Sequence, residues 1–231
     1  MSVRLVLSSS AVFSKLPSTS VSPPEVLSEA QRDRRESEID RLRDKHPDGT
    51  DEDLSRRAGS FHPHLGWICC ISAVRGGPEE IGEPKSWTAA SREEESRLLD
   101  QFWADVHVIG RHHDKNGKQL RWVTFNGKQF DVPFLTARTV ASGLTPTRKD
   151  ITNTYPYDHE PHADLMGPWP SSSYSLEGLC SFLGAETPKG EVDGSMVAKL
   201  TRERGLEEVA EYCEGDAVAT LRCAQEASVL L

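Results

Sequence analysis

The sequence has no surplus of positive charge. Its 231 residues include 36 acidic and 27 basic side chains, which gives a formal net charge of −9. This balance excludes a chain that holds nucleic acid through a general excess of lysine and arginine. It leaves open chemistry on phosphodiesters, because carboxylate-bound cations can meet the phosphate charge in an acidic protein.

Zinc-binding spacings and long apolar runs are also missing. The five cysteines form no Cys-x-x-Cys pair, so we expect buried, reduced thiols. No run approaches the roughly 18 apolar residues of a membrane span. The apolar start is interrupted by three serines and lacks an A-x-A cleavage site, so a strand explains it better than a secretory signal. We therefore predict a cytoplasmic location and no membrane partner.

Apolar and β-branched runs predict strands over residues 3–16, 67–74, 81–88 and 120–125. Ser91 with Glu94 three residues later predicts a capping box at the start of a helix. Helical spacing predicts further helices over residues 131–142, 174–183, 195–204 and 206–231. This alternation predicts one α/β layered domain spanning residues 1–231.

Residues 25–59 differ in composition from the rest. They mix charges of both signs with sparse Leu and Ile at helical spacing. We interpret them as a charged helical insertion, broken near Pro47-Asp48-Gly49. A solvated surface and a surface for a protein partner both remain open for it.

Two short segments could carry chemistry. In FNGKQFDVPFL, residues 125–135, Asn126-Gly127 favours a sharp turn and Asp131 begins the next helix. The spacing alone favours Asp131 as a helix N-cap rather than a metal ligand. In YCEGDAVATLRCA, residues 212–224, Tyr212 and Asp216 are four apart and share a helix face. Such a pair can orient a water and hold a metal, or it can be a packed tyrosine beside an exposed aspartate.

Taken together, the two segments resemble the second and third motifs of the DEDD 3′→5′ exonucleases with a tyrosine in the last motif. The resemblance is closest to predicted exonucleases similar to the proofreading domain of family B DNA polymerases. It includes residues 61–74, HADLM at 162–166 and residues 174–197, and so covers about two thirds of the chain. It implies a ribonuclease-H-like fold, a mixed five-stranded sheet flanked by helices.

The resemblance also implies a site. In that family four acidic residues bind two divalent ions, Mg²⁺ or Mn²⁺, which carry out hydrolysis at the 3′ end of single-stranded DNA or RNA. Here Asp131 and Asp216 match two of these acids, Tyr212 matches the tyrosine, and Asp164 is a supporting metal-ligand candidate.

Other side chains have weaker assignments. Asn126 is a candidate for contact with a 3′-terminal nucleotide, although its turn needs no such role. Phe130 and Phe134 are candidates for stacking on bases, although core packing is the favoured explanation for both. Trp169 is a further candidate for base stacking. We expect His159 and His162 to be solvent-exposed loop histidines rather than ligands.

The pattern departs from the family at the opening strand. An Asp-x-Glu is expected there, but Ser14 and Leu16 occupy the two positions. Neither side chain supplies the charge that holds divalent cations. Three alternatives remain open: a weakened nuclease that recruits Glu25 or Asp164, an inactive nucleic-acid-binding or assembly module, and a different reading frame over residues 1–25.

Overall fold

A single mixed sheet forms the centre of the molecule. The computed structural model describes residues 3–12, 28–51, 54–55, 58, 62–116, 120–167, 175–187 and 205–227. Five strands pair in the order β3-β2-β1-β4-β5. They are β1 (Val3–Val12), β2 (Trp67–Gly76), β3 (Lys85–Thr88), β4 (Leu120–Thr124) and β5 (His162–Asp164). The β1–β2 and β2–β3 pairs are antiparallel, whereas β1–β4 and β4–β5 are parallel. A mixed α/β architecture is therefore confirmed.

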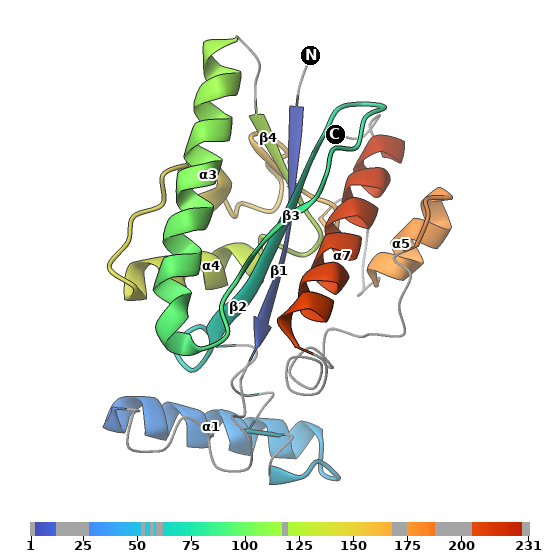
Figure 1. Ribbon diagram of the computed structural model, residues 1–231. Coiled ribbons are helices and arrows are strands. Elements are labelled where there is room, and N and C mark those ends of the chain that lie inside the picture. The colour runs from blue at the N-terminus through green and yellow to red at the C-terminus, as the bar shows by residue number, and fades with distance from the viewer. Residues whose placement is uncertain are drawn as a thin grey trace.

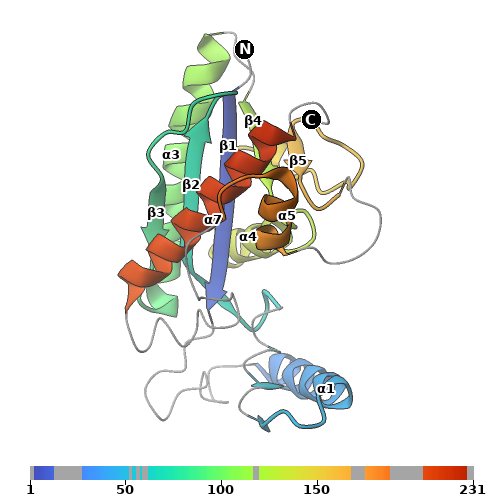
Figure 2. The same ribbon diagram turned by 90° about the vertical axis from the view of Figure 1, so that its right-hand side faces the viewer.

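Helices cover both faces of this sheet. On one face lie α3 (Glu95–Lys115) and α4 (Asp131–Ala141), and on the other lie α5 (Leu176–Leu183) and α7 (Leu206–Glu226) (Figures 1 and 2). Residues 67–74 of β2 are buried without interruption. Cover on both faces explains why β2 is a continuous apolar run rather than an alternating one. Among the described residues, no helix is long and apolar enough to cross a membrane.

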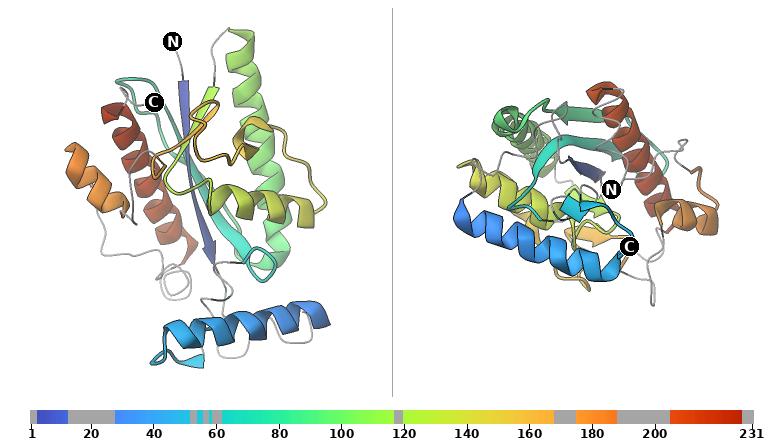
Figure 3. Two further views of the ribbon diagram at one scale, coloured as in Figure 1. Left: turned by 180° about the vertical axis from the view of Figure 1, so that it is seen from behind. Right: turned by 90° about the horizontal axis from the view of Figure 1, so that it is seen from below.

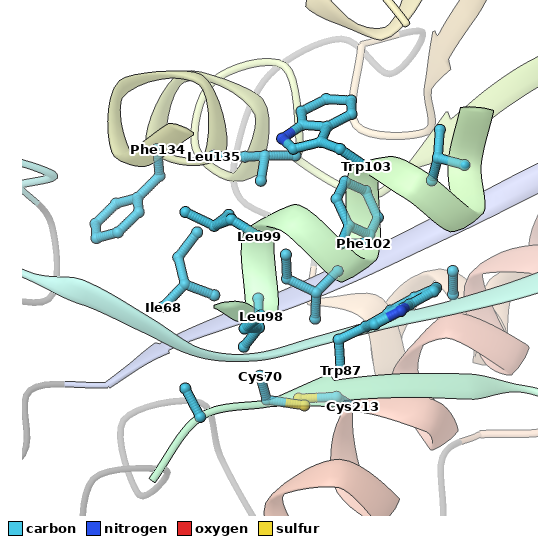
Figure 4. Close-up of a cluster of buried hydrophobic side chains, with 14 of the residues drawn as sticks. Ile68, Cys70, Trp87, Leu98, Leu99, Phe102, Trp103, Phe134, Leu135 and Cys213 are labelled. Atoms are coloured by element: carbon cyan, nitrogen blue, oxygen red, sulfur yellow. The ribbon is translucent and has the colours of Figure 1, made fainter. Parts of the chain in front are cut away.

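The larger core cluster packs mainly between the sheet and α3 and α4. Figure 4 shows Leu98, Leu99, Phe102 and Trp103 of α3 facing Ile68 of β2. A second cluster joins the sheet to α5 and α7 through Val74, Val123, Leu165, Leu179, Ala217 and Leu221. All five cysteines are buried and none is in a disulfide, as predicted.

Some predicted boundaries were wrong. Ser91 precedes a 3₁₀ turn, η1 (Arg92–Glu94), and its side chain makes no capping hydrogen bond. The Glu94 carboxylate instead accepts a hydrogen bond from the amide of Ala90, so the predicted capping box does not form. The strand expected over residues 81–88 is confined to β3, and Ile81 makes only an isolated bridge with Gly76. The helix predicted over residues 195–204 lies outside the described residues.

The charged insertion contains α1 (Glu29–Lys45), which ends just before Pro47. This helix lies beyond the end of the sheet toward which β1 points (Figure 1). A small separate core of Leu42, Leu54 and Ala58 supports it. The buried Glu38 carboxylate contacts His62 Nε2 at 3.2 Å, which ties α1 to the segment before β2. The insertion is therefore attached to the sheet while keeping its own apolar contacts.

Candidate active site

The turn between β4 and α4 has the geometry that Asn-Gly predicted. Asn126 has φ of 59°, in the left-handed region that Asn tolerates better than most residues. A side chain at Gly127 would overlap Thr124, so this position accepts only glycine without rearrangement. The turn passes directly into α4, because the Phe130 amide donates to the Asn126 carbonyl and the Val132 amide donates to that of Gly127.

Asp164, the last residue of β5, holds this turn in place. Its Oδ1 accepts hydrogen bonds from the amides of Asn126 (2.8 Å) and Met166 (3.0 Å), and its Oδ2 accepts one from the amide of Lys128 (2.8 Å). The Asp164 side chain is buried. These contacts support a structural role for Asp164, while its role as a metal ligand stays a prediction.

Two further buried polar side chains surround the turn. Lys128 Nζ donates to the carbonyls of Tyr155 (2.6 Å) and Asp158 (2.5 Å), and burial lowers the pKa of its ammonium. His162 is fully buried in β5, so the expectation of an exposed loop histidine was wrong. Burial lowers the pKa of His162 to about 4. The turn is therefore surrounded by a polar layer of three buried side chains, Asp164, Lys128 and His162.

Sequence reasoning missed this layer, although a signal existed. His162 and Asp164 alternate around Ala163 on a strand, so the two side chains share one face. That spacing could have predicted that both side chains lie beside the end of β4, where the turn begins. The partners of Lys128 are two loop carbonyls, which no residue pattern indicates.

Asp131 is the first residue of α4 and is half-buried. The N-cap is Phe130, and no side-chain capping hydrogen bond forms there. The N-cap role that the spacing favoured for Asp131 is thus not seen. The first amides of α4 instead donate hydrogen bonds to carbonyls of the preceding turn. Phe130 is partly buried against the main core, whereas Phe134 is fully packed within it.

Tyr212 and Asp216 lie one turn apart on α7, as their spacing predicted. The Tyr212 hydroxyl donates a hydrogen bond to the Asp216 carboxylate, and Tyr212 packs against the main core. Burial raises the pKa of Asp216 to about 6, and the tyrosine hydrogen bond opposes this rise. The carboxylate is therefore desolvated, a state that a nearby cation would favour.

The two candidate aspartates belong to helices on opposite faces of the sheet. Both α4 and α7 contact β1, from opposite faces of the sheet (Figure 3). Within the described part of the chain, no group of three His, Cys, Asp or Glu side chains is arranged to hold a metal. Ser14, Leu16, Glu25 and Trp169 lie outside the described residues. The structure thus brings Tyr212 close to Asp216 on α7. Asp131 begins α4, on the other face of the sheet.

Comparison with known proteins supports one family. Residues 60–223 match the model of a family described as predicted 3′-5′ exonucleases related to the exonuclease domain of PolB. No curated protein matches the chain. The family B DNA polymerase of Pyrobaculum calidifontis has a similar fold, with a TM-score of 0.61, 14% sequence identity, and coverage of 99% of this chain but only 25% of the polymerase.

A second solved structure is E. coli Exonuclease I in complex with a dT13 oligonucleotide. It has a TM-score of 0.42 and 14% identity over 99% of this chain and 41% of that protein. The chain thus spans a quarter of the polymerase and less than half of the exonuclease. Because the family match covers more than half of the sequence, the chain belongs to the family of predicted 3′-5′ exonucleases related to the exonuclease domain of PolB.

Proposed function

We propose that this chain hydrolyses single-stranded DNA or RNA from the 3′ end, with divalent cations as cofactors. The observation that carries this proposal is the hydrogen-bonded pair of Tyr212 and Asp216, whose half-buried carboxylate has a raised pKa. The strand order, with β1 central and parallel to β4, supports a ribonuclease-H-like topology for the sheet. Asp131, at the start of α4, is the second acid in the proposed site.

In this proposal the site holds one divalent cation rather than two. Asp131 and Asp216 would supply the hard carboxylate oxygens that Mg²⁺ and Mn²⁺ prefer. The desolvated carboxylate of Asp216 would gain from a bound cation, because that charge offsets the cost of burial. The second ion of the family would need the acids that Ser14 and Leu16 replace. A bound cation would polarise the scissile phosphate and lower the pKa of an attacking water.

The protein side chains would orient the reacting groups. Tyr212 is held by Asp216 and packed against the core, so its hydroxyl has a fixed position from which to orient a water. Asn126 and Phe130 flank the turn before α4 and would contact the terminal nucleotide. The Asp164 hydrogen bonds keep that turn in one conformation.

A second function is favoured by the replaced first motif. With Ser14 and Leu16 in place of the two acids, the chain would bind a nucleic-acid 3′ end without cutting it. A protein partner at residues 25–59 would belong to this alternative. Both functions share the binding surface and differ only in hydrolysis.

The test is digestion of labelled single-stranded DNA and RNA by the purified chain with Mn²⁺. Digestion should proceed from the 3′ end and disappear in Asp216→Asn. Tyr212→Phe should lower the rate by about 10²-fold, which is typical for loss of a proton-handling group. Asp100→Asn removes an exposed carboxylate on α3 and serves as the matched control.

The outcomes separate the two functions. No digestion by the wild-type protein, or digestion unchanged in Asp216→Asn, would reject hydrolysis at this site. Binding of the same oligonucleotides without digestion would then support the second function. Absence of both would reject the two together.

A further inference from the structure

A cavity of about 890 Å³ lies on the side of α4 that faces away from the sheet. Its walls come from α1, the segment before β2, η1, the start of α3, α4 and the loop after η2, Asp150–Thr152. Pro133, two residues after Asp131, is part of the lining. The cavity therefore adjoins the helix that begins with a candidate metal ligand.

One of the two arginines that line this cavity is fully neutralised. Arg138 Nε and Nη2 donate to Glu95 at 2.9 and 2.5 Å, and its Nη1 donates to the Pro63 carbonyl at 3.1 Å. The Ile68 amide also donates to Glu95 Oε1, at 2.7 Å. Both side chains of this ion pair are buried. Glu95 is therefore committed to Arg138 and the β2 backbone.

The second arginine, Arg92, has no such partner. Within the described residues its half-buried guanidinium makes no hydrogen bond and no ion pair. Burial lowers the pKa of Arg92 and the positive charge of Arg138 lowers it further, whereas the charges of Glu95 and Glu93 oppose this lowering. A half-buried guanidinium whose donors have no hydrogen-bond acceptor among the described residues would be stabilised by an anion in the cavity.

The remaining walls can recognise an anion. The lining includes three hydroxyl-bearing residues and one histidine, namely Ser96, Thr136, Thr154 and His64. Hydroxyl and guanidinium donors together are a usual combination for phosphate oxygens. In a chain of net charge −9, such a local cation is needed to hold a polyanion.

We propose that this cavity binds a phosphate group of a nucleotide, with Arg92 as the main contact. The choice of a nucleotide rests on the proposed function. The lining residues of α4 extend from Pro133 to Ser142, roughly 3–17 Å along the helix axis from Asp131 at 1.5 Å per residue. In this proposal, a strand whose 3′ end lies at Asp131 runs along α4 and presents an upstream phosphate to Arg92. A free nucleotide could present the same group.

The experiment measures binding of the full chain in EDTA, so that hydrolysis is not required. One arm follows a fluorescent 12-nucleotide oligothymidylate by anisotropy at 50 to 200 mM salt, and another titrates thymidine 5′-monophosphate by calorimetry. Arg92→Gln should weaken oligonucleotide binding about five- to tenfold at low salt, as expected for a lost charged hydrogen bond. It should also lower the slope of log K against log salt by about 0.7, the value for one phosphate on a single strand.

Two variants serve as controls. Arg92→Lys keeps the charge and should retain most of the affinity. Arg97→Gln removes an exposed guanidinium that pairs with Glu94 outside the cavity, and it should bind like wild type. Because Arg92 makes no hydrogen bond or ion pair with the residues that the structure describes, Arg92→Gln should leave the melting temperature unchanged or slightly raised. A loss of affinity then reports on the ligand rather than on folding.

Each outcome decides the proposal. If Arg92→Gln weakens binding of the oligonucleotide but not of the monophosphate, the ligand is a backbone phosphate. If it weakens binding of the monophosphate but not of the oligonucleotide, the ligand is a free nucleotide. Equal binding by Arg92→Gln and wild type, or equal weakening by Arg97→Gln, overturns the cavity site even if the protein digests DNA. Arg92-dependent binding without digestion supports the cavity site and rejects hydrolysis. No binding of either ligand by wild type overturns the site.

Discussion

Acidification should destabilise this fold through one buried histidine. His162 Nδ1 lies 3.2 Å from the Asn153 carbonyl, so this nitrogen carries the proton and donates. Its Nε2 lies 2.9 Å from the Thr124 hydroxyl, which then donates to the ring. Both nitrogens of the neutral ring are thus hydrogen-bonded. A second proton would bind at Nε2 and point at the Thr124 hydroxyl hydrogen, so this hydrogen bond would be lost.

The size of the effect follows from the pKa in the two states. Burial lowers the folded pKa to about 4, with a further lowering by Lys128 and an opposing effect of Asp164. The unfolded value is about 6.5. Between these values the unfolded chain binds more protons, so stability rises with pH. The contribution is fully present above pH 6.5 and is lost as pH falls toward 4, which amounts to about 2 kcal/mol at pH 5.

The measurement is urea unfolding at pH 5.0 and 7.5, followed by tryptophan fluorescence. Wild type should lose about 2 kcal/mol more than His162→Gln between the two pH values, because glutamine does not titrate. His107→Gln removes an exposed histidine of α3 and should keep the wild-type pH dependence. Identical pH dependence of wild type and His162→Gln would refute a neutral, desolvated ring.

Three further changes test the turn and the buried ion pair. Asp164→Asn should cost about 2 kcal/mol in urea unfolding, since an amide nitrogen cannot accept the amide hydrogen bonds of the turn, and an unchanged midpoint would contradict the role of Asp164. Gly127→Ala should cost about 1–3 kcal/mol, because its methyl group overlaps Thr124, and a stabilised variant would count against this overlap. Arg138→Met should lower the free energy of unfolding by about 3–5 kcal/mol, because it leaves the buried Glu95 carboxylate without its partner. The double variant Arg138→Met, Glu95→Gln should recover part of this loss.

Much of the fold follows from local patterns. The apolar run of β2 marks a strand covered on both faces, and Asn126-Gly127 marks the turn before α4. The face shared by Tyr212 and Asp216 follows from helical spacing alone. In each case the pattern depends on residues within one turn or one strand, so no distant contact has to be known.

Features that depend on distant contacts were not predictable. Ser91 with Glu94 has the composition of a capping box, but the carboxylate bonds to Ala90 and the helix starts later. The burial of His162 depends on Asn153 and Thr124, and only the folded chain brings them to the same ring. The pairing of Glu95 with Arg138 rather than with the nearby Arg92 joins residues 43 apart in sequence, and no spacing reveals it.

The pairing of β1 with β2 has a consequence for the evolution and engineering of this chain. Val12 and Trp67 are directly opposed in the antiparallel ladder, although more than fifty residues separate them in sequence. The chain therefore leaves the sheet at Val12 and returns to it at Trp67, about one strand spacing away. A tight hairpin could replace α1 and its small core without shifting any pairing in the sheet. Changing or deleting α1 would therefore alter its contacts with His62 and one wall of the cavity, rather than the pairing of the strands.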